Sequence, residues 1–272
     1  MRIRFWGVRG SIACPGAETI RYGGNTPCIE VTCGDHVLIF DAGTGLRALG
    51  NALVAHSKAR HFDIFLTHCH LDHVTGLPFF APFFAEGYSI RIWAGNLLPD
   101  TNVEQVMRKI MSSPLFPVEV EIFKAAIEFR DFRSGDVLKP FDGATLHTAP
   151  LDHPDGCSGY RLEHNGKVFS LISDTEGFPG KRDPELTSLA RNADLIVYDA
   201  TFTEEELATR AGWGHSTWVR GIRLAEAANA RQLCLFHHDP SHDDDFMDLL
   251  AVEANDARPG TITAREGQII DL

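Results

Sequence analysis

Residues 65–76 read "FLTHCHLDHVTG", and this stretch decides the fold. An apolar run ends at Thr67, and four possible metal ligands follow within six residues: His68, His70, Asp72 and His73. Imidazole and carboxylate together suit zinc, manganese or iron better than magnesium or calcium. We expect His68 and His70 to point the same way from a strand end, with Asp72 and His73 in the turn that follows, able to face a second ion. The next residues, "GLPFFAPFF" (76–84), are expected to form a helix.

Around this stretch, short apolar segments alternate with helical patterns. Strands are expected at 2–8, 26–33, 36–43, 62–68, 88–95, 144–149, 158–164, 167–173, 193–201 and 231–238. Helices are expected at 44–59, with Thr44 as N-cap, at 101–113, and at 243–257, whose first turn is rich in aspartate. Hairpins mixed with strand–helix units predict a layered α/β protein with mixed sheets rather than a purely parallel one.

Composition bounds the class of protein. The 272 residues are 44% hydrophobic, enough for a large core, and the formal net charge is −12. Such a charge disfavours long nucleic acid as a partner. The N-terminus shows no secretory signal, and no apolar run of about 18 residues occurs, so we expect a soluble, cytoplasmic chain with reduced cysteines and no membrane partner.

The segment "THCHLDH" resembles the HxHxDH motif of the metallo-β-lactamase superfamily. The resemblance implies an αββα sandwich, in which two mixed sheets are flanked by helices and the metal ligands lie on loops at one edge. It implies that residues 1–272 form a single hydrolase domain with two divalent metal ions. Zinc is the preferred ion, with manganese or iron as alternatives.

The resemblance also implies further ligands downstream, in a set order and at strand ends. His153 follows the strand ending at Ala149, and Asp174 directly follows "KVFSLIS". A late histidine is expected in "LFHHD", where His237 is preferred over His238 because it is the first residue beyond the apolar run. The implied ligands of metal one are His68, His70 and His153, those of metal two are Asp72, His73 and His237, and Asp174 bridges the two ions.

Asp41, in "LIFDAGTG", matches an aspartate of the family after an early strand. It either orients a ligand histidine from outside the metal shell or caps the helix that begins near Thr44. The sequence does not decide between these two roles.

Two later motifs narrow the reaction. "AGWGHSTWVRG" (211–221) contains His215, and "DLIVYDATF" (194–202) contains Asp199. They resemble the "HST" and "EATF" motifs of the phosphodiesterase branch typified by RNase Z, where a histidine faces the scissile phosphate and an acidic residue pairs with it. The catalytic residues implied are His215, Asp199 and Asp72, and Asp199 departs from the usual glutamate. Metal-bound hydroxide would attack phosphorus while a cationic His215 stabilises the phosphate and leaving group.

The substrate follows less directly. No basic arm of the RNase Z kind stands out, and Met111, Leu115 and Phe116, in a 96–120 segment, could cover a small, flat ligand. We therefore expect a small phosphodiester, in the first instance a cyclic nucleotide, whose base an aromatic lid could stack. The alternatives are tRNA 3′-processing, a lactone or thioester hydrolase on the same metals, and a sensor without turnover. A homodimer is common in this branch. Weaker candidates for substrate contacts are Arg9, Ser11, Asn25 and Arg161.

Overall fold

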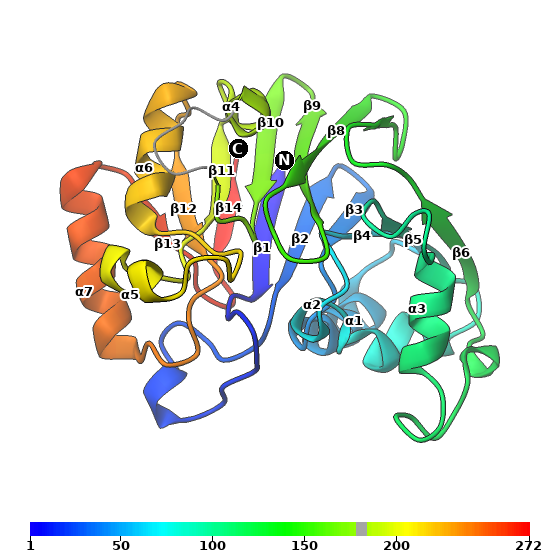
Figure 1. The fold of residues 1–272 in the computed structure, drawn as a ribbon. Coiled ribbons are helices and arrows are strands. Elements are labelled where there is room, and N and C mark those ends of the chain that lie inside the picture. The colour runs from blue at the N-terminus through cyan, green and yellow to red at the C-terminus, as the bar shows by residue number, and fades with distance from the viewer. Residues whose placement is uncertain (178–183) are drawn as a thin grey trace.

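Two seven-stranded sheets packed face to face form the centre of the computed structural model, which describes residues 1–177 and 184–272 (Figure 1). The strand order of the first sheet is β14-β1-β2-β3-β4-β5-β6, and that of the second is β13-β12-β11-β10-β9-β8-β7. Each sheet mixes parallel and antiparallel neighbours, as the sequence predicts.

The first sheet comes from the N-terminal half of the chain and one C-terminal strand. Its strands are β1 (Arg2–Gly7), β2 (Cys28–Cys33), β3 (His36–Phe40), β4 (His61–Leu66), β5 (Ser89–Ala94), β6 (Ala126–Asp131) and β14 (Ile269–Asp271). Its helices are α1 (Gly45–His56), α2 (Leu71–Val74) and α3 (Val103–Ile110), with short 3-10 turns η1 (Ala17–Thr19), η2 (Leu77–Phe79), η3 (Ala81–Phe84) and η4 (Val120–Ile122).

The second sheet comes from the C-terminal half. Its strands are β7 (Val137–Leu138), β8 (Ala144–Leu151), β9 (Cys157–His164), β10 (Lys167–Ile172), β11 (Leu195–Asp199), β12 (Leu233–Phe236) and β13 (Ile262–Thr263). Its helices are α4 (Pro184–Ala190), α5 (Glu204–Thr209), α6 (Trp218–Ala227) and α7 (Asp244–Ala257).

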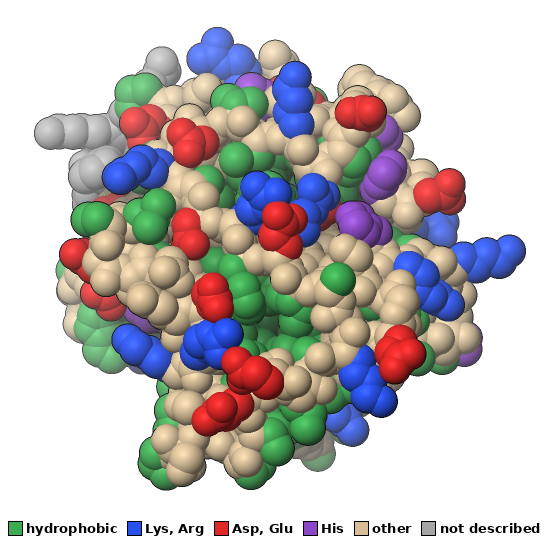
Figure 2. Space-filling view, turned by 90° about the vertical axis from the view of Figure 1, so that its right-hand side faces the viewer, with side chains coloured by type: hydrophobic (Ala, Val, Ile, Leu, Met, Phe, Trp, Pro, Cys, Tyr) green, Lys and Arg blue, Asp and Glu red, His purple; other side chains and the backbone are tan. Residues whose placement is uncertain are grey.

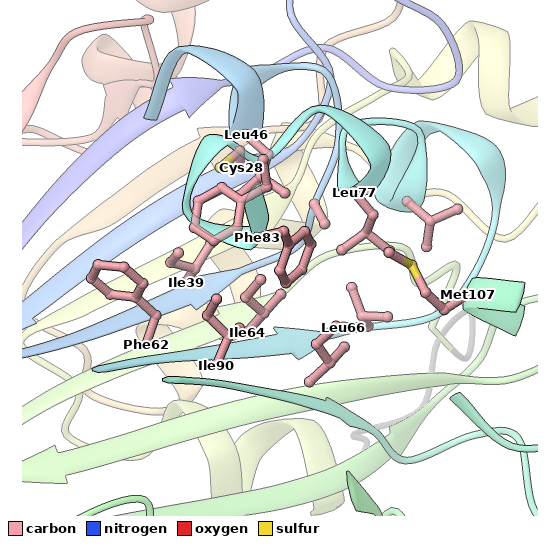
Figure 3. Packing of buried hydrophobic residues seen from close by; sticks show 14 of the residues in the cluster. Cys28, Ile39, Leu46, Phe62, Ile64, Leu66, Leu77, Phe83, Ile90 and Met107 are labelled. Carbon is pink, nitrogen blue, oxygen red and sulfur yellow. The ribbon is translucent and has the colours of Figure 1, made fainter. Parts of the chain in front are cut away.

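Three layers of buried apolar side chains hold the sandwich together. Alternate residues of both sheets, among them Phe40, Phe65 and Phe169, fill the space between the sheets. A second cluster lies between the first sheet and its helices, where Ile64 and Phe83 are fully buried (Figure 3). A third lies between the second sheet and α4, α6 and α7. Each strand of the two sheet centres is thus covered on both faces, which explains the near-continuous apolar runs in the sequence.

Two local expectations are wrong. Residues 76–84 do not form a helix but two 3-10 turns, η2 and η3, each with a proline at its start. Proline lacks the backbone N–H that a continuous α-helix needs at interior positions, so Pro78 and Pro82 divide the segment. Thr44 makes no capping bond to α1, because its hydroxyl is hydrogen-bonded to Asn25 and the amide of Thr26.

The carboxyl ends of parallel strands place loops from both sheets at one edge of the sandwich. β3 and β4 run parallel in the first sheet, and β10, β11 and β12 run parallel in the second. The residues that follow these strands therefore face one another across the gap between the sheets. Among the described residues, none of the helices is both long and apolar enough to cross a lipid bilayer.

Candidate metal centre

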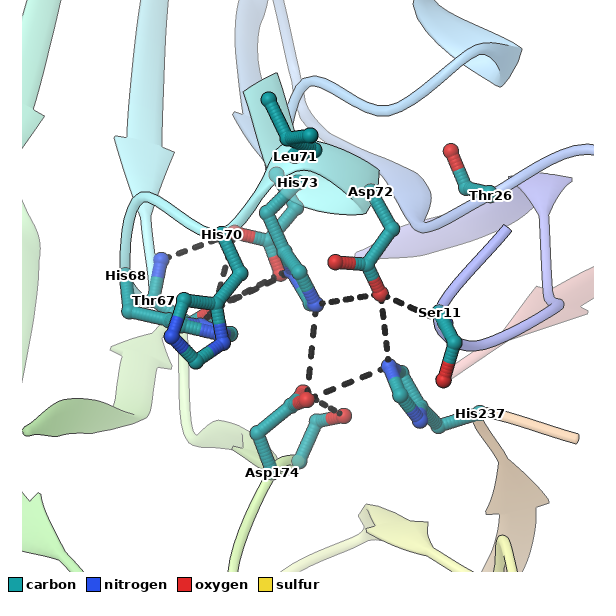
Figure 4. Close-up of polar contacts among 12 residues, drawn as sticks. Ser11, Thr26, Thr67, His68, His70, Leu71, Asp72, His73, Asp174 and His237 are labelled. Carbon is teal, nitrogen blue, oxygen red and sulfur yellow. Dashed lines mark hydrogen bonds and ion pairs between the residues drawn. The ribbon is translucent and has the colours of Figure 1, made fainter. Parts of the chain in front are cut away.

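All seven predicted metal ligands meet at this edge of the sandwich. Their ligand atoms form overlapping groups within 4.8 Å of one another: His68, His70 and His153 make one group, and Asp72, His73 and His237 make another. Asp174 Oδ1 lies 3.4 Å from His73 Nε2 and 3.1 Å from His237 Nε2 (Figure 4). Asp174 also groups with His68 and His73, so it touches both sets of predicted ligands.

The histidine rings are held from behind. The Nδ1 atom of His68 lies 3.1 Å from the Thr67 hydroxyl, and that of His237 lies 3.0 Å from the Thr201 hydroxyl. On His73 the Nδ1 atom pairs with Asp41 at 2.9 Å. A partner at Nδ1 fixes the ring orientation and leaves the Nε2 lone pair for a metal.

The Nε2 atoms of His68, His73 and His237 are buried and make no hydrogen bond of good geometry with the described residues, although those of His73 and His237 lie within ion-pair distance of Asp72 and Asp174. Buried polar atoms without partners are rare and costly, so a convergent set of them calls for a ligand. Three imidazole nitrogens beside two carboxylates form a donor set that suits divalent transition-metal ions. The described residues therefore fit the divalent cations that the fold implies.

The remaining pair of ligands is less enclosed. His70 turns its Nδ1 atom inward, 3.1 Å from His153 Nε2, while its Nε2 atom faces Asp155 at 3.4 Å. His153 Nδ1 donates to the carbonyl of Gly214 at 2.8 Å, which directs Nε2 toward the cluster. Burial lowers the pKa of His153, so the neutral, metal-binding form of the ring is favoured.

The role of Asp41 is now decided by its contacts. Besides His73, its carboxylate accepts hydrogen bonds from the amide and the hydroxyl of Thr67, at 2.8 and 3.0 Å. Asp41 thus orients a candidate ligand histidine and fixes the residue before His68. It does not cap α1.

The centre carries an excess of negative charge. Asp41, Asp72, Asp174 and Asp199 are buried, and among the residues that the structure describes they pair with histidines and with no lysine or arginine. Burial lowers the pKa of His73, but the carboxylates of Asp174, Asp41 and Asp72 outweigh it and raise that pKa well above its usual value. A cation would take the place of this proton, so we expect metal binding to compete with protons.

The two adjacent histidines after β12 have different surroundings. The ring of His237 lies in the cluster, 3.4 Å from Asp72, whereas His238 points away and its Nε2 contacts the carbonyl of Ala264 at 2.9 Å. Burial lowers the pKa of His238 to about 3, so its ring is neutral. The geometry supports the preference for His237 over His238.

Several site residues occupy a strained backbone conformation. Asp41 and His237 directly follow β3 and β12, Asp174 lies two residues after the end of β10, and each of the three has a φ near 60°. Non-glycine residues rarely adopt this left-handed region, although aspartate and histidine do so more than most. The turn lets each side chain leave the sheet edge toward the gap, and strain of this kind is typical of functional sites.

His215 lies beside the centre and is paired with Asp199. Its Nδ1 atom is 3.0 Å from Asp199 Oδ2, and its ring stacks on His237 with centroids 4.9 Å apart. Burial alone lowers the pKa of His215, but Asp199, with Asp174 and Asp72, raises it to about 9. The shorter aspartate therefore reaches the histidine, and His215 is kept cationic near neutral pH.

Asp199 is fully committed to the protein. One oxygen accepts from the amides of Asp174 and Thr175, and the other accepts from the amides of Thr201 and Ser216 and the hydroxyl of Thr201. Because both oxygens are occupied in this way, Asp199 is an orienting group for His215 rather than a metal ligand. Thr67 and Thr201 were not identified from the sequence as residues that orient the ligand histidines. Thr67 directly precedes His68, and Thr201 lies within "DATF".

The weaker candidates for substrate contacts have mainly structural partners. Arg9 is fully buried and donates to the carbonyls of Gly23, Asp239 and His242, which ties the loop after His237 to the N-terminal loop. Asn25 bonds to Glu266 and Thr44, and Arg161 bonds to Glu163 and to carbonyls near α4. Ser11 alone reaches the centre, where its amide donates to Asp72 at 2.7 Å.

The predicted lid over the ligand is wrong in its main element. Met111 is 1% exposed and belongs to the core cluster under α3, and Phe116 packs edge-to-face on Phe79. Leu115 is exposed, and the ring of its neighbour Phe116 contacts that of Phe79. The buried apolar residues of this segment pack on the first sheet. From the sequence alone, this pattern is indistinguishable from that of an apolar lid over a ligand.

Comparison with known proteins gives the family. Residues 36–238 match the model of the beta-lactamase superfamily domain. The chain belongs to this superfamily. Its αββα architecture is the metallo-β-lactamase fold. Curated ribonucleases Z match it along most of its length.

Three similar proteins illustrate the relationship. Ribonuclease Z of Archaeoglobus fulgidus is 25% identical, with 100% of this chain and 97% of that protein covered. The short form of human tRNase Z superposes with a TM-score of 0.71 at 18% identity, covering 100% of this chain and 99% of the other. A diphosphatase of the PhnP family superposes with a TM-score of 0.68 at 19% identity, covering 100% and 97%. At these identities the two structural likenesses describe the fold.

Proposed function

We propose that this superfamily member hydrolyses phosphodiester bonds at a centre of two divalent metal ions, with zinc as the preferred ion. The observation that carries the proposal is the pair of His215 and Asp199, 3.0 Å apart beside the predicted ligands. Hydrolysis of an ester or lactone by the same metals does not require a cationic side chain at this place. A phosphodiester does benefit from one, because negative charge grows on the phosphate and on the leaving oxygen.

The protein's own groups divide the work as follows. Divalent cations held by the seven ligands would supply Lewis acidity and lower the pKa of a water molecule. Asp199 holds His215 at Nδ1, and no hydrogen bond from a described residue occupies its Nε2, which would face the phosphate and donate a proton to the leaving oxygen. The Asp72 carboxylate accepts a hydrogen bond from the Ser11 amide and contacts His73 and His237. It therefore connects the N-terminal loop to the reaction site.

Both sheets contribute to the site, which supports the idea that residues 1–272 act as one hydrolase domain. His68, His70, Asp72 and His73 follow a strand of the first sheet, and His153, Asp174 and His237 follow strands of the second. Neither half of the chain holds the predicted ligand set alone.

The substrate is proposed at the level of a phosphodiester. Because Met111 lies in the core and Phe116 packs on Phe79, the expected aromatic lid no longer supports a cyclic nucleotide, which stays a prediction to be tested. Three exposed apolar side chains lie within two positions of site residues in the sequence: Ile12, Leu71 and Trp213.

Processing of tRNA 3′ ends is the second candidate, favoured by the match to ribonuclease Z along the whole chain. The negative net charge does not form one continuous field on the face shown in Figure 2, where basic and acidic side chains are interspersed. On α3 and β6, Arg108 pairs with Glu104 and Glu121, and Arg130 pairs with Glu128. The overall charge is therefore a weaker argument against RNA than the composition suggests.

The test is a substrate panel with protein loaded with zinc, manganese or iron. Bis(p-nitrophenyl) phosphate, cyclic nucleotides, precursor tRNA, a lactone and a thioester separate the candidate functions. Turnover of phosphodiesters but not of the esters is expected. A protein that holds two metals and hydrolyses only the lactone or thioester would contradict the proposal.

A further inference from the structure

We propose that Glu176 is a positioning residue that sets the orientation of His153 and His215 together. Glu176 lies two residues after Asp174, and its carboxylate oxygen Oε2 accepts hydrogen bonds from the backbone amides of Gly212 and Gly214, at 2.6 and 3.4 Å. Sequence motifs give no sign of this contact, because the two segments are more than thirty positions apart in the chain.

The loop that Glu176 holds has little structure of its own. Gly212 and Gly214 both have a left-handed φ, +86° and +81°, and the loop joins α5 to the start of α6. Glycine gains the most freedom when a constraint is removed, so a glycine-rich loop needs an external anchor to hold one conformation. The carboxylate supplies that anchor with charge-assisted hydrogen bonds, which are stronger than neutral ones.

The anchored loop controls a predicted metal ligand. The carbonyl of Gly214 accepts the hydrogen bond from His153 Nδ1 at 2.8 Å, and this bond sets which ring nitrogen faces the cluster. The contact is so close that a Cβ atom on Gly214 would lie 2.2 Å from His153 Nδ1. A shift of the loop therefore moves or frees the His153 ring.

The same loop carries His215, the residue after Gly214. The rings of His153 and His215 contact each other with centroids 5.3 Å apart. One carboxylate thus fixes the loop that positions both a ligand of the predicted first metal, His153, and the proposed proton donor, His215.

Glu176 is itself fixed by its backbone. Its amide donates to the carbonyl of Asp152 at 2.9 Å, and its carbonyl accepts from Arg220 on α6 at 2.6 Å. These bonds connect the turn after Asp174, the segment before His153 and the helix after His215. The role in the reaction rests on the proposed phosphodiesterase function, whereas the role in holding His153 does not.

The experiment compares E176A, E176Q and E176D with the wild type in the full chain. E30Q and E30A are matched controls, because Glu30 lies on β2 outside the ligand loops, is also half-buried, and likewise accepts two hydrogen bonds, from Trp6 at 2.8 Å and from the Thr32 hydroxyl at 3.4 Å. Zinc is titrated into metal-free protein by calorimetry, and turnover is then measured at saturating zinc.

We expect E176A to weaken one of the two zinc-binding steps by about 10–100-fold and leave the other within about threefold, as is usual for groups that orient metal ligands. E176Q retains an acceptor oxygen and should stay within about threefold of the wild type, and E176D, one methylene shorter, should resemble E176A. At saturating zinc, E176A should lower kcat more than it raises KM, since His215 is displaced. The Glu30 variants should bind zinc as the wild type does.

Equal zinc binding by E176A and the wild type would overturn the proposal, and so would equal weakening of both steps. If E176A does not fold, E176D and E176Q decide: weakened binding in E176D but not in E176Q supports the role, and equal behaviour of the two overturns it. A wild type without phosphodiesterase activity would contradict the proposed function only, since the zinc titration still tests Glu176.

Discussion

Replacement of His215 by alanine separates the two tasks that the structure gives to this side chain. Asp199 raises the pKa of His215 to about 9, so the protonated imidazolium is the favoured form near neutral pH. A positioned proton donor contributes about 10²–10⁴-fold to a rate, or about 3–5 kcal/mol of barrier. The seven predicted ligands are untouched, so H215A should keep its full metal content.

The size of the loss should depend on the leaving group. p-Nitrophenolate is a stable anion that needs little protonation, so we expect a loss of about 10–100-fold with bis(p-nitrophenyl) phosphate, from lost charge stabilisation alone. An alkoxide leaving group, as in a dinucleotide, needs the proton, and the loss should be at least about tenfold larger.

The assay is kcat/KM for both substrates at saturating metal, with metal content measured by mass spectrometry. H56A is the control, since His56 is exposed at the end of α1. Equal losses with the two leaving groups would refute proton donation and leave only charge stabilisation. Unchanged turnover with both substrates would refute any catalytic role for His215.

Four further outcomes follow from the same geometry. Because the pKa of His215 is raised, its proton is present below about pH 9 and lost above it, so kcat/KM for the dinucleotide should fall as pH rises through that value; a flat profile from about pH 8 to 10 would contradict this. D199N should move that fall to lower pH, since the largest contribution that raises the pKa of His215 is lost and only Asp174 and Asp72 still oppose the effect of burial. Its free energy of unfolding should drop by about 1–3 kcal/mol, because an amide N–H replaces an oxygen that accepts from N–H donors; pH–rate profiles and urea melts test both. G214A should lose affinity for one metal, since its Cβ would lie 2.2 Å from His153 Nδ1, and two unweakened binding steps in a zinc titration would argue against that contact. Chelation should lower Tm, by an amount that depends on the metal concentration restored afterwards, and a Tm unaffected by added zinc would speak against a site in this cluster.

The sequence was most informative where chemistry depends on position along a strand. His68 stood out because it follows an apolar strand, and the family resemblance implied Asp174 and His237 at the ends of later strands, whose carboxyl ends lie at one edge of the sandwich. The pairing of Asp199 with His215 followed from two motifs of the branch. These features are local in the chain, so periodicity and motif order suffice to place them.

What was missed depends on contacts that are distant in the chain. The anchoring of the His215 loop by Glu176 and the carbonyl of Gly214 behind His153 are visible only once the sheets are packed. The edge strand β6 was overlooked because its residues alternate between half-buried and exposed and lack a continuous apolar run. The prediction of a lid was wrong because an apolar residue in the sequence can serve the core as well as a ligand. Met111 packs against the first sheet, not against a ligand.

The division of the ligands between the two sheets has a consequence for how the protein is held together. A cation bound by both His73 and His237 would act as a cross-link between the first and last thirds of the chain, as a disulfide bond does. Closing so long a loop removes much conformational entropy from the unfolded chain, so the metal would stabilise the packing of one sheet on the other as well as enabling the reaction. Loss of the metal in the cell would then lower the stability of the contact between the two sheets, and the larger unfolded fraction would be exposed to degradation.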